Sequence, residues 1–366
     1  MWVIGIAVVL VFLYASVIVR TAMLVPGEVS EAMYQKANVS VIVPCRNEAN
    51  NIASCIHAIA SQTVFTEHVE LIIVDDHSED DTKSIVENAG RSVPLRLIES
   101  NGFGKKAALL TGLRQASHNI ICTIDADCIT PVRHLEIMTG EFLKAKLKML
   151  CGPVNFKAEG LFEKLQQAES AAVVGISAVF LNAGKPATCN GANLMFEKKA
   201  FFDAGGYNGH TTLASGDDDL LMQSMYGKFQ AGVKYCMHQG TVVETAAVKG
   251  LGNLLNQRGR WITKSAFYIF PWNKYLQLLV SVHLISFFLL LLYGVLSLQL
   301  YLLIPVAVKY TADFVLGVRL KKVLKLNLFM IFLMPFYQLY VFLLPLSSLI
   351  YKTDWKGRRL ISSNNS

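Results

Sequence analysis

The segment NIICTIDADC (residues 119–128) is the most informative part of the sequence for predicting the fold. Its apolar part, Ile120 to Ile124, has the composition of a buried strand, yet it runs directly into two carboxylates, Asp125 and Asp127. Alternation along a strand would put these two side chains on the same side. A turn or a helix cap is the structural interpretation of such a pair, and a ligand site is the functional one. The neighbouring sequence favours the ligand site.

Three earlier parts of the chain repeat the alternation of an apolar strand with a helical pattern. The expected strands are residues 39–44, 69–76 and 94–100, and the expected helices are residues 47–60, 80–89 and 105–116. Apolar strands separated by helices predict an α/β fold with a mostly parallel central sheet that is covered on both faces. In such sheets, ligands bind at the carboxyl ends of the strands.

Each expected strand ends in a polar cluster, so these clusters should meet at one edge of the sheet. They read PCRNE (44–48), DDHSED (75–80), ESNGFGKK (99–106) and DADC (125–128). Several carboxylates beside lysines are costly to bury unless a cation or a charged ligand balances them. A hard divalent ion that bridges carboxylate and diphosphate oxygens would balance them. A P-loop is excluded, because Glu99 and Lys106 stand where that motif needs Gly and Ser or Thr.

The composition points to a membrane. Of the 366 residues 53% are hydrophobic, and the mean hydropathy is +0.40, which exceeds the usual value for a soluble domain. Residues 1–20 are predicted to be an N-terminal transmembrane anchor, since Trp2 to Val19 carry no charge. A cleaved signal peptide is the alternative interpretation.

A second apolar region, residues 275–350, is predicted to be a C-terminal transmembrane region. Its apolar segments are residues 275–296, 298–318 and 328–350. The last segment contains Pro335 and Pro345 and can form a re-entrant or broken hairpin. Between the two apolar regions, residues 38–265 have ordinary polarity and are numerous enough for one large globular domain.

Basic residues predict on which side of the membrane the globular domain lies. Arg20 follows the first apolar segment, and a basic cluster follows the third one. The cluster consists of Arg319, Lys321, Lys322 and Lys325. Both positions predict a cytoplasmic globular domain at a bacterial-type plasma membrane. The basic tail, residues 351–366, would lie outside if every segment crossed the membrane, so its side stays open.

Charge and cysteine content narrow the class further. The net charge of +7 suits a chain beside anionic lipid headgroups, and no stripe of basic and aromatic residues indicates a nucleic-acid partner. The seven cysteines form no CxxC motif and no paired spacing. We therefore expect buried thiols in a reducing compartment, and neither disulfides nor a zinc site.

Together with three later motifs, these features resemble family 2 glycosyltransferases. This inverting class has the GT-A fold and includes cellulose, hyaluronan and chitin synthases and ceramide glucosyltransferase. The later motifs are Gly-x-Asn at Gly191 and Asn193, Gly-Gly-Tyr at 205–207 followed by acidic Asp217 and Asp218, and QxxRW at Gln257, Arg260 and Trp261. The resemblance covers residues 38–265 and implies a GT-A nucleotide-sugar-binding domain with α-helical transmembrane segments.

The resemblance also implies roles for individual residues. Asp127, with Asp125 beside it, would hold Mg²⁺ or Mn²⁺, and Asp125 would turn toward the ribose or the donor sugar. The other residues implied in binding the nucleotide-sugar are Pro44, Asn47, Glu48, Asp75, Asp76 and Lys105. Residues implied in contact with the acceptor or the diphosphate are Gly191, Asn193, Gln257, Arg260 and Trp261. Structural alternatives are a solvated helix start for Lys105 and an interfacial Arg–Trp pair for QxxRW.

Inversion needs a base that takes the proton of the acceptor hydroxyl. The acidic motif reads Gly-Asp-Asp-Asp where the family usually has Glu-Asp, so Asp217, Asp218 or Asp219 could serve. Alignment with the family favours Asp218, and a neighbouring aspartate could cap the following helix. His77 stands where the family usually has Gly and is interpreted as a turn residue.

The expected reaction is inverting, metal-dependent transfer from a nucleotide-sugar, a UDP-sugar, to a membrane-associated acceptor in polysaccharide or cell-envelope glycan synthesis. A single transfer onto a lipid such as ceramide or diacylglycerol is the alternative within the enzyme class. A non-catalytic membrane protein that binds nucleotide-sugars is the alternative outside it. Donor sugar, linkage and oligomeric state depend on the shape of pockets and surfaces, which motifs do not specify.

Overall fold

The computed structural model describes most of the chain. The described residues are 2–25, 37–64, 68–208, 216–333, 354–355 and 358–359. The last predicted apolar segment is therefore described only as far as residue 333. The predicted hairpin at Pro335 and Pro345 and most of the basic tail lie outside the described residues.

A central sheet organises the globular part. Its strands are β1 (Val39–Cys45), β2 (Val69–Asp75), β3 (Leu95–Glu99), β4 (Ile120–Thr123), β6 (Met149–Cys151), β8 (Leu194–Glu197) and β9 (Val233–Tyr235). Within the described residues the strand order is β3-β2-β1-β4-β8-β6-β9. Strand β8 runs antiparallel to β4 and to β6, and the other neighbours are parallel. The predicted mostly parallel sheet is confirmed.

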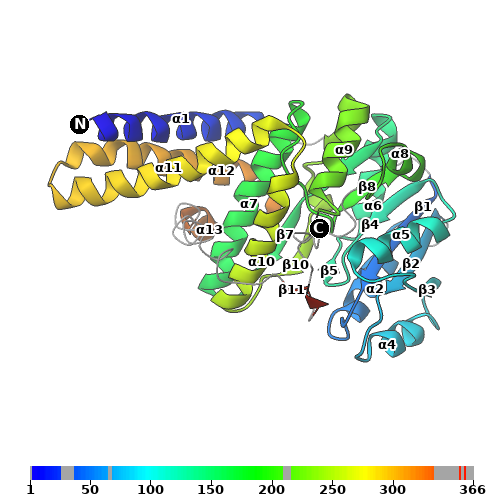
Figure 1. Cartoon of the computed structure of the whole chain (residues 1–366). Helices are drawn as coiled ribbons and strands as arrows, with labels where there is room; N and C mark the ends of the chain where they lie inside the picture. The colour runs from blue at the N-terminus through cyan, green and yellow to red at the C-terminus, as the bar shows by residue number, and fades with distance from the viewer. Residues whose placement is uncertain are drawn as a thin grey trace, which may run out of the picture.

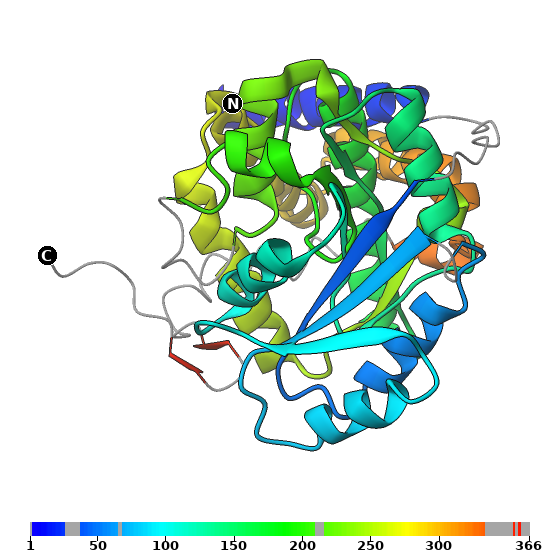
Figure 2. The same ribbon diagram turned by 90° about the vertical axis from the view of Figure 1, so that its right-hand side faces the viewer.

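Helices cover both faces of this sheet, as Figure 2 shows for α2, α4 and α5 around strands β1 to β3. One core contains α2 (Ile52–Ala60), α4 (Thr82–Ala89) and α6 (His134–Lys144); the other contains α5 (Lys105–Gln115), α7 (Leu161–Asn182), α8 (Lys198–Asp203) and α9 (Asp219–Phe229). Val41 and Val43 face the first core, and Ile42 faces the second. Burial on both faces explains why the strands are continuously apolar.

A small second sheet lies beside the end of β4. It contains β5 (Cys128–Ile129), β7 (Val154–Lys157) and β10 (Val243–Ala246), in the order β5-β10-β7. Strand β10 is antiparallel to β5 and parallel to β7. Shorter elements of the described chain are η1 (Gln230–Gly232), η2 (Gln239–Thr241), η3 (Ser265–Phe267), η4 (Leu300–Leu302), β11 (Asp354–Trp355) and β12 (Arg358–Arg359).

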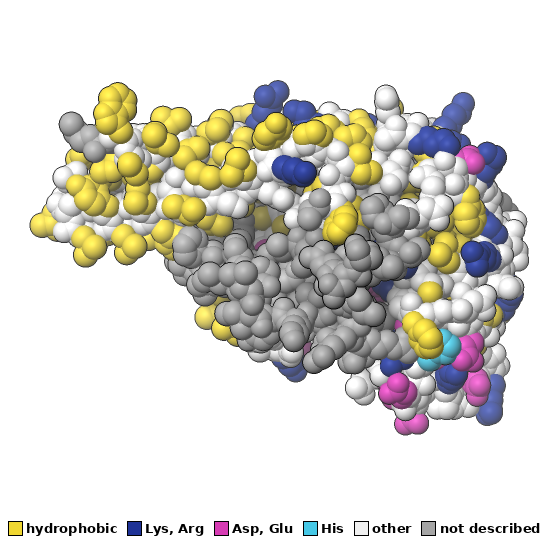
Figure 3. Space-filling model, viewed as in Figure 1, with side chains coloured by type: hydrophobic (Ala, Val, Ile, Leu, Met, Phe, Trp, Pro, Cys, Tyr) yellow, Lys and Arg dark blue, Asp and Glu magenta, His cyan; other side chains and the backbone are white. Residues whose placement is uncertain are grey.

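An apolar helical extension projects from the globular part (Figure 1). It consists of α1 (Trp2–Leu24), α11 (Pro271–Leu296) and α12 (Leu303–Leu324), which contact one another. Among the described residues, three helical segments are long and apolar enough to cross a membrane: Trp2–Leu24, Pro271–Leu296 and Leu300–Leu324. Hydrophobic side chains cover this extension on the face shown in Figure 3.

Helix α7 joins the extension to the sheet. It contacts α1, α12 and α13 (Leu328–Leu333), and it also packs on β7 and β9. Gly175 allows the close approach to α12, because a Cβ atom at this position would lie 2.8 Å from a methyl carbon of Leu320. Helix α10 (Leu251–Lys264) lies beside α7 and precedes α11 in the chain (Figure 1).

A polar cluster is buried where α1, α11 and α12 meet. Lys309 and Asp313 form an ion pair one turn apart on α12. His283 of α11 lies beside them, and its ring centroid is 3.7 Å from that of Tyr14 on α1. The Lys309 ammonium also lies 5.1 Å from the ring centroid of Phe287. Each charge is therefore balanced inside the helix bundle.

Asp313→Leu should leave the buried Lys309 ammonium without its carboxylate and cost about 3–5 kcal/mol of stability. Combining Lys309→Met with Asp313→Leu removes both charges and should restore most of that loss. Thermal unfolding of the detergent-purified protein checks this. A double variant as unstable as the single one would show that the unpaired charge is not the cause.

Candidate functional site

A cavity of about 580 Å³ lies at the carboxyl edge of the central sheet, between the ends of β1 and β4 and helix α10. Twelve of the predicted site residues line it: Pro44, Glu48, Asp76, Lys105, Asp125, Asp127, Gly191, Asp217, Asp218, Gln257, Arg260 and Trp261. Three predicted residues, Asn47, Asp75 and Asn193, are absent from its described lining. Segments far apart in sequence thus meet at the edge where the strand pattern predicted a site.

Asp125 and Asp127 lie in the turn between β4 and β5, after the strand has ended. The Cys128 N–H donates to the Asp125 carbonyl oxygen over 3.0 Å and so closes the turn. Thr245 of β10 donates its hydroxyl to Asp127 Oδ2 over 3.2 Å. Both carboxylates reach the cavity, as expected, but the turn and the second sheet place them there; strand alternation does not.

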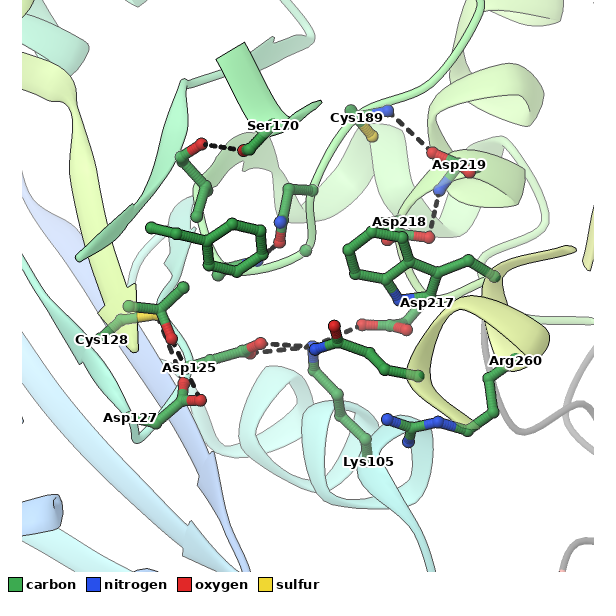
Figure 4. Close-up of a pocket in the computed structure, with 18 of the residues that line it drawn as sticks. Lys105, Asp125, Asp127, Cys128, Ser170, Cys189, Asp217, Asp218, Asp219 and Arg260 are labelled. Atoms are coloured by element: carbon green, nitrogen blue, oxygen red, sulfur yellow. Dashed lines mark hydrogen bonds and ion pairs between the residues drawn. The ribbon is translucent and has the colours of Figure 1, made fainter. Parts of the chain in front are cut away.

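Lys105, at the first position of α5, bridges two acidic segments (Figure 4). Its ammonium nitrogen is 2.8 Å from Asp125 Oδ1 and 2.8 Å from Asp217 Oδ2. Burial disfavours the charged ammonium, yet the two carboxylates outweigh it and raise the pKa of Lys105 well above its usual value. Lys105 is therefore a fixed positive charge between the two carboxylates.

The ion pairs of Lys105 leave no room for a side chain at Gly191. A Cβ atom at Gly191 would lie 2.7 Å from Asp217 Oδ2 and 3.2 Å from Lys105 Nζ. The Thr123 hydroxyl, at the end of β4, donates to the Gly191 carbonyl oxygen over 3.0 Å. A side chain at this position would push the bridging carboxylate and ammonium apart.

The other two aspartates of the acidic motif differ in their surroundings. Asp218 caps α9, and its Oδ1 accepts the Asp219 N–H over 2.6 Å. Asp219 is fully buried and accepts hydrogen bonds from the Thr188 hydroxyl (2.7 Å), the Cys189 N–H (2.7 Å) and the Tyr268 hydroxyl (2.6 Å). Both aspartates line the cavity, but Asp219 is enclosed by protein groups that it holds together.

Lys264, the last residue of α10, contacts both of these aspartates. Its ammonium nitrogen is 2.9 Å from Asp218 Oδ1 and 2.8 Å from Asp219 Oδ2. Burial raises the pKa of Asp218 to about 6, and the Asp219 and Asp217 carboxylates add to this effect while Lys264 opposes it. Asp218 thus combines access to the cavity with a pKa close to neutrality.

Helix α10 presents the predicted QxxRW residues to the cavity. Gln257, Arg260 and Trp261 line it, and the unpredicted Arg258 between them is buried. Arg258 pairs with Glu169 of α7, with Nη2 2.5 Å from Oε2. The Arg258 guanidinium carbon also lies 4.2 Å from the centroid of the Trp261 ring, so it supports one aromatic residue of the lining.

The ends of β1 and β2 form the opposite wall. Asp76 Oδ2 accepts the Gly104 N–H over 2.9 Å, and Arg46, which sequence analysis missed, donates to the Asp76 carbonyl oxygen over 2.9 Å. Asn47 and Asp75 instead stabilise the adjoining turns. Asn47 Oδ1 accepts the Glu79 N–H over 2.9 Å, and Asp75 Oδ2 accepts the Ser78 N–H over 3.0 Å.

His77 occupies the turn after β2 in a left-handed conformation, with a φ of 55°. A glycine adopts such a φ without steric cost, which accounts for the residue usual at this position in the family that the sequence resembles. His77 Nδ1 is 2.9 Å from Glu99 Oε1. It does not line the described cavity, which agrees with its interpretation as a turn residue.

The predicted contact of Asn193 with acceptor or diphosphate is not supported. Its side chain is fully buried, and its amide nitrogen donates to the carbonyl oxygens of Pro153 (2.9 Å) and Thr241 (2.8 Å). Asn193 Oδ1 is 2.8 Å from His134 Nε2. Burial lowers the pKa of His134 to about 4, so the imidazole is neutral. All of these contacts hold loops to the sheet.

All seven cysteines are free and buried, as expected. Burial raises the pKa of the Cys122 thiol to about 12. Among the described residues, no group of three or more His, Cys, Asp or Glu side chains could hold a metal ion. A metal at Asp125 and Asp127 would therefore need further ligands from water or from a substrate, which is how Mg²⁺ is often bound beside phosphates.

Two missed residues left a signal in the sequence. Lys264 is seven residues after Gln257 and four after Arg260, a spacing that puts all three on one face of a helix. Arg258 lies inside the QRGRW segment itself. Glu169, which pairs with Arg258, belongs to no motif and could be found only from the fold.

Comparisons with known proteins agree with this architecture. Residues 40–202 match the family model described as glycosyl transferase family 2. Glycosyltransferase AglE of Haloferax volcanii is 35% identical over 120 residues, which cover 32% of this chain and 40% of AglE. Poly-beta-1,6-N-acetyl-D-glucosamine synthase of Staphylococcus epidermidis is 25% identical over 231 residues, covering 62% of this chain and 54% of that protein. The chain thus spans about half or less of these curated relatives.

Among solved structures, the mannosyltransferase PcManGT from Pyrobaculum calidifontis, in complex with GDP-Man and Mn²⁺, is similar to the whole chain. The TM-score is 0.61 at 19% sequence identity, and the match covers 95% of this chain and 99% of that one. At this identity the likeness concerns the fold. Fold, motifs and family model agree: residues 40–202 match the glycosyl transferase family 2 model, and they lie in an α/β domain with a GT-A-like fold.

Proposed function

We propose that this protein transfers a sugar, with inversion, from a UDP-sugar to a membrane-associated glycan acceptor, with the help of Mg²⁺ or Mn²⁺. One observation carries the proposal: Asp125 and Asp127 line one side of a single cavity, and Asp217 and Asp218 line another. Lys105 lies between the two sets. This arrangement provides separate carboxylates for a metal–diphosphate group and for proton transfer.

The donor would bind along the ends of β1 and β2. Pro44, Glu48 and Asp76 line this part of the cavity and offer one apolar and two acidic surfaces to a base and ribose. Lys105 is available to a diphosphate at the junction with Asp125. An ammonium that is already charged and held in place suits a dianionic ligand, because no further ordering of its side chain is required.

Asp127 and Asp125 would hold the metal. Asp127 fits this role because it is exposed and its contacts are weak: the Thr245 hydroxyl is 3.2 Å away, and the Cys128 thiol, 3.4 Å away, is a weak donor. Its oxygens are therefore weakly bound and accessible to a cation. When bound, the metal would act as a Lewis acid that neutralises negative charge on the leaving diphosphate.

Asp218 would take the proton of the attacking hydroxyl. All three aspartates of the motif line the cavity, but Asp217 is bound to Lys105 and Asp219 accepts three hydrogen bonds from protein donors, which leaves Asp218 as the candidate base. Among the described residues, its ion pair and its hydrogen bond both use Oδ1 and none uses Oδ2. One carboxylate oxygen thus remains for the acceptor.

A lipid acceptor is a second candidate, and one feature of the cavity favours it. Four apolar residues of β7 and α7 line the cavity, Val154, Phe156, Val173 and Val174, beside the polar α7 residues Glu169, Ser170 and Ser177. Helix α7 also contacts α12 and α13 beside the membrane-spanning candidates. Incubation with labelled UDP-sugars, followed by lipid extraction and polymer precipitation, separates a glycan product from a glycolipid; UDP-sugar hydrolysis without either product would indicate another acceptor.

The catalytic domain would face the cytoplasm at the plasma membrane. Arg20 on α1 and Arg319 and Lys321 on α12 are exposed near the ends of these helices that adjoin the globular part. Positive charge at this end of the apolar extension agrees with the excess of basic residues on the cytoplasmic side of membrane proteins. The nucleotide-sugar donor is also a cytoplasmic metabolite in the reaction proposed.

Asp127→Ala should weaken Mn²⁺-dependent nucleotide binding by more than about 100-fold, because even indirect partners of a metal typically contribute about 10–100-fold. Titration calorimetry with UDP, with and without Mn²⁺, measures this. Asp203→Ala is the matched control, since Asp203 lies on the surface and pairs with Lys199. Retained metal-dependent affinity in Asp127→Ala would remove this residue from the metal site.

Asp218→Asn should lower kcat by about 10²- to 10⁴-fold, the usual contribution of a general base, and leave metal-dependent nucleotide affinity intact. In the wild-type enzyme, kcat should fall as the pH drops below about 6, because Asp218 then becomes protonated and cannot accept a proton. Initial rates at saturating donor across pH 5–8 test this. Unchanged turnover in Asp218→Asn would reject Asp218 as the base.

A further inference from the structure

We propose that Lys264 is a positioning residue: it holds the carboxylate of the base Asp218 in a fixed position relative to helix α10. This inference rests on the proposed function. Lys264 lies beyond the QxxRW residues and belongs to none of the predicted motifs. Its ammonium joins α10, which presents Gln257, Arg260 and Trp261 to the cavity, to the start of α9, where the acidic motif lies. The base and the residues facing the acceptor are thereby linked by one side chain.

Lys264 connects Asp219, whose side chain is fixed by the protein, to Asp218, the proposed base. Asp219 is fully buried and bound by Thr188, Cys189 and Tyr268. Lys264 Nζ is 2.8 Å from Asp219 and 2.9 Å from Asp218. Its side chain is only 7% exposed, so surrounding atoms restrict its motion. An ammonium between two adjacent carboxylates restricts the rotamer of the one that faces the cavity.

The repulsion between neighbouring carboxylates explains why a lysine is needed at position 264. Asp217, Asp218 and Asp219 are consecutive, and three neighbouring carboxylates repel one another strongly when water is excluded. Lys105 neutralises Asp217, and Lys264 lies between the other two. Without Lys264, Asp218 and Asp219 would lose the one ammonium that lies between them. One of them would then move away or bind a proton, and Asp218, the less buried of the two, is the one able to move.

The segment that follows Lys264 shows which elements this connection joins. Tyr268 donates to Asp219, and the Ile269 N–H donates to Gln223 Oε1 of α9 over 2.8 Å. Asn273, near the start of α11, donates its amide to the Pro186 carbonyl oxygen over 3.0 Å. The segment that leads into α11 is thus hydrogen-bonded to α9, the helix that begins at the acidic motif. Lys264 therefore couples the base to elements that would meet a membrane-bound acceptor.

Lys264→Gln and Lys264→Arg test the inference together. The Gln variant removes the charge and should lower kcat by about 10- to 100-fold, the effect expected when a reacting group is displaced by about 1 Å. Metal-dependent nucleotide affinity should change by less than about threefold, since Lys264 lies at the base and not at the donor wall. The Arg variant keeps the charge and should recover a large part of kcat. Lys249→Gln, which alters an exposed lysine just before α10, is the matched control.

Two results would overturn the inference: an unchanged kcat in Lys264→Gln, or equal losses of kcat, nucleotide affinity and melting temperature in both variants. The second would make Lys264 only a support of the fold. If Lys264→Gln does not fold, Tyr268→Phe keeps the aromatic ring but removes the hydroxyl from Asp219, and normal kcat there counts equally against the inference. An active Asp218→Asn would instead reject the proposed base itself, so the two failures are distinguishable.

Discussion

The site depends on two lysines that each lie between two carboxylates and reduce the repulsion between them. Lys105 binds Asp125 and Asp217, and Lys264 binds Asp218 and Asp219. Unpaired charges of this kind would be strongly destabilising, whereas paired charges with good geometry can be kept at a cavity wall. Each lysine also joins segments that are distant in sequence. The ion pairs that offset the charge of the carboxylates therefore also hold the parts of the site together.

The topology of the sheet explains why these segments meet. Strand β4 lies between β1 and β8, and its carboxyl end leads into the turn that carries Asp125 and Asp127. Because β8 is antiparallel to β4, its amino end lies beside that turn, and Gly191 just before β8 reaches the cavity. A parallel β8 would have carried this loop to the opposite edge of the sheet.

The same elements connect the cavity to the apolar helices. Helix α7 lines the cavity on one side and contacts α1, α12 and α13. Helix α10 is held to α7 by the buried pair of Arg258 and Glu169, and α11 follows it directly in the chain. The proposed membrane-associated acceptor would therefore contact walls of the cavity that are continuous with the membrane-spanning candidates.

Several features could be predicted from the amino-acid sequence: the alternation of strands and helices, the carboxylates at strand ends, the Gly-x-Asn and acidic motifs, and the apolar helices. The strands, the helices and the position of the carboxylates follow from local periodicity and from the rule that parallel strands end at one edge, whereas the two motifs were identified by their resemblance to family 2 glycosyltransferases. The three-dimensional structure is needed to show which groups bind each aspartate of the acidic motif, and that the Asn193 side chain is buried and hydrogen-bonded to protein groups. The reason is that hydrogen-bond partners are chosen by packing: Lys264 and Asp218 are 46 residues apart, and no local pattern relates them.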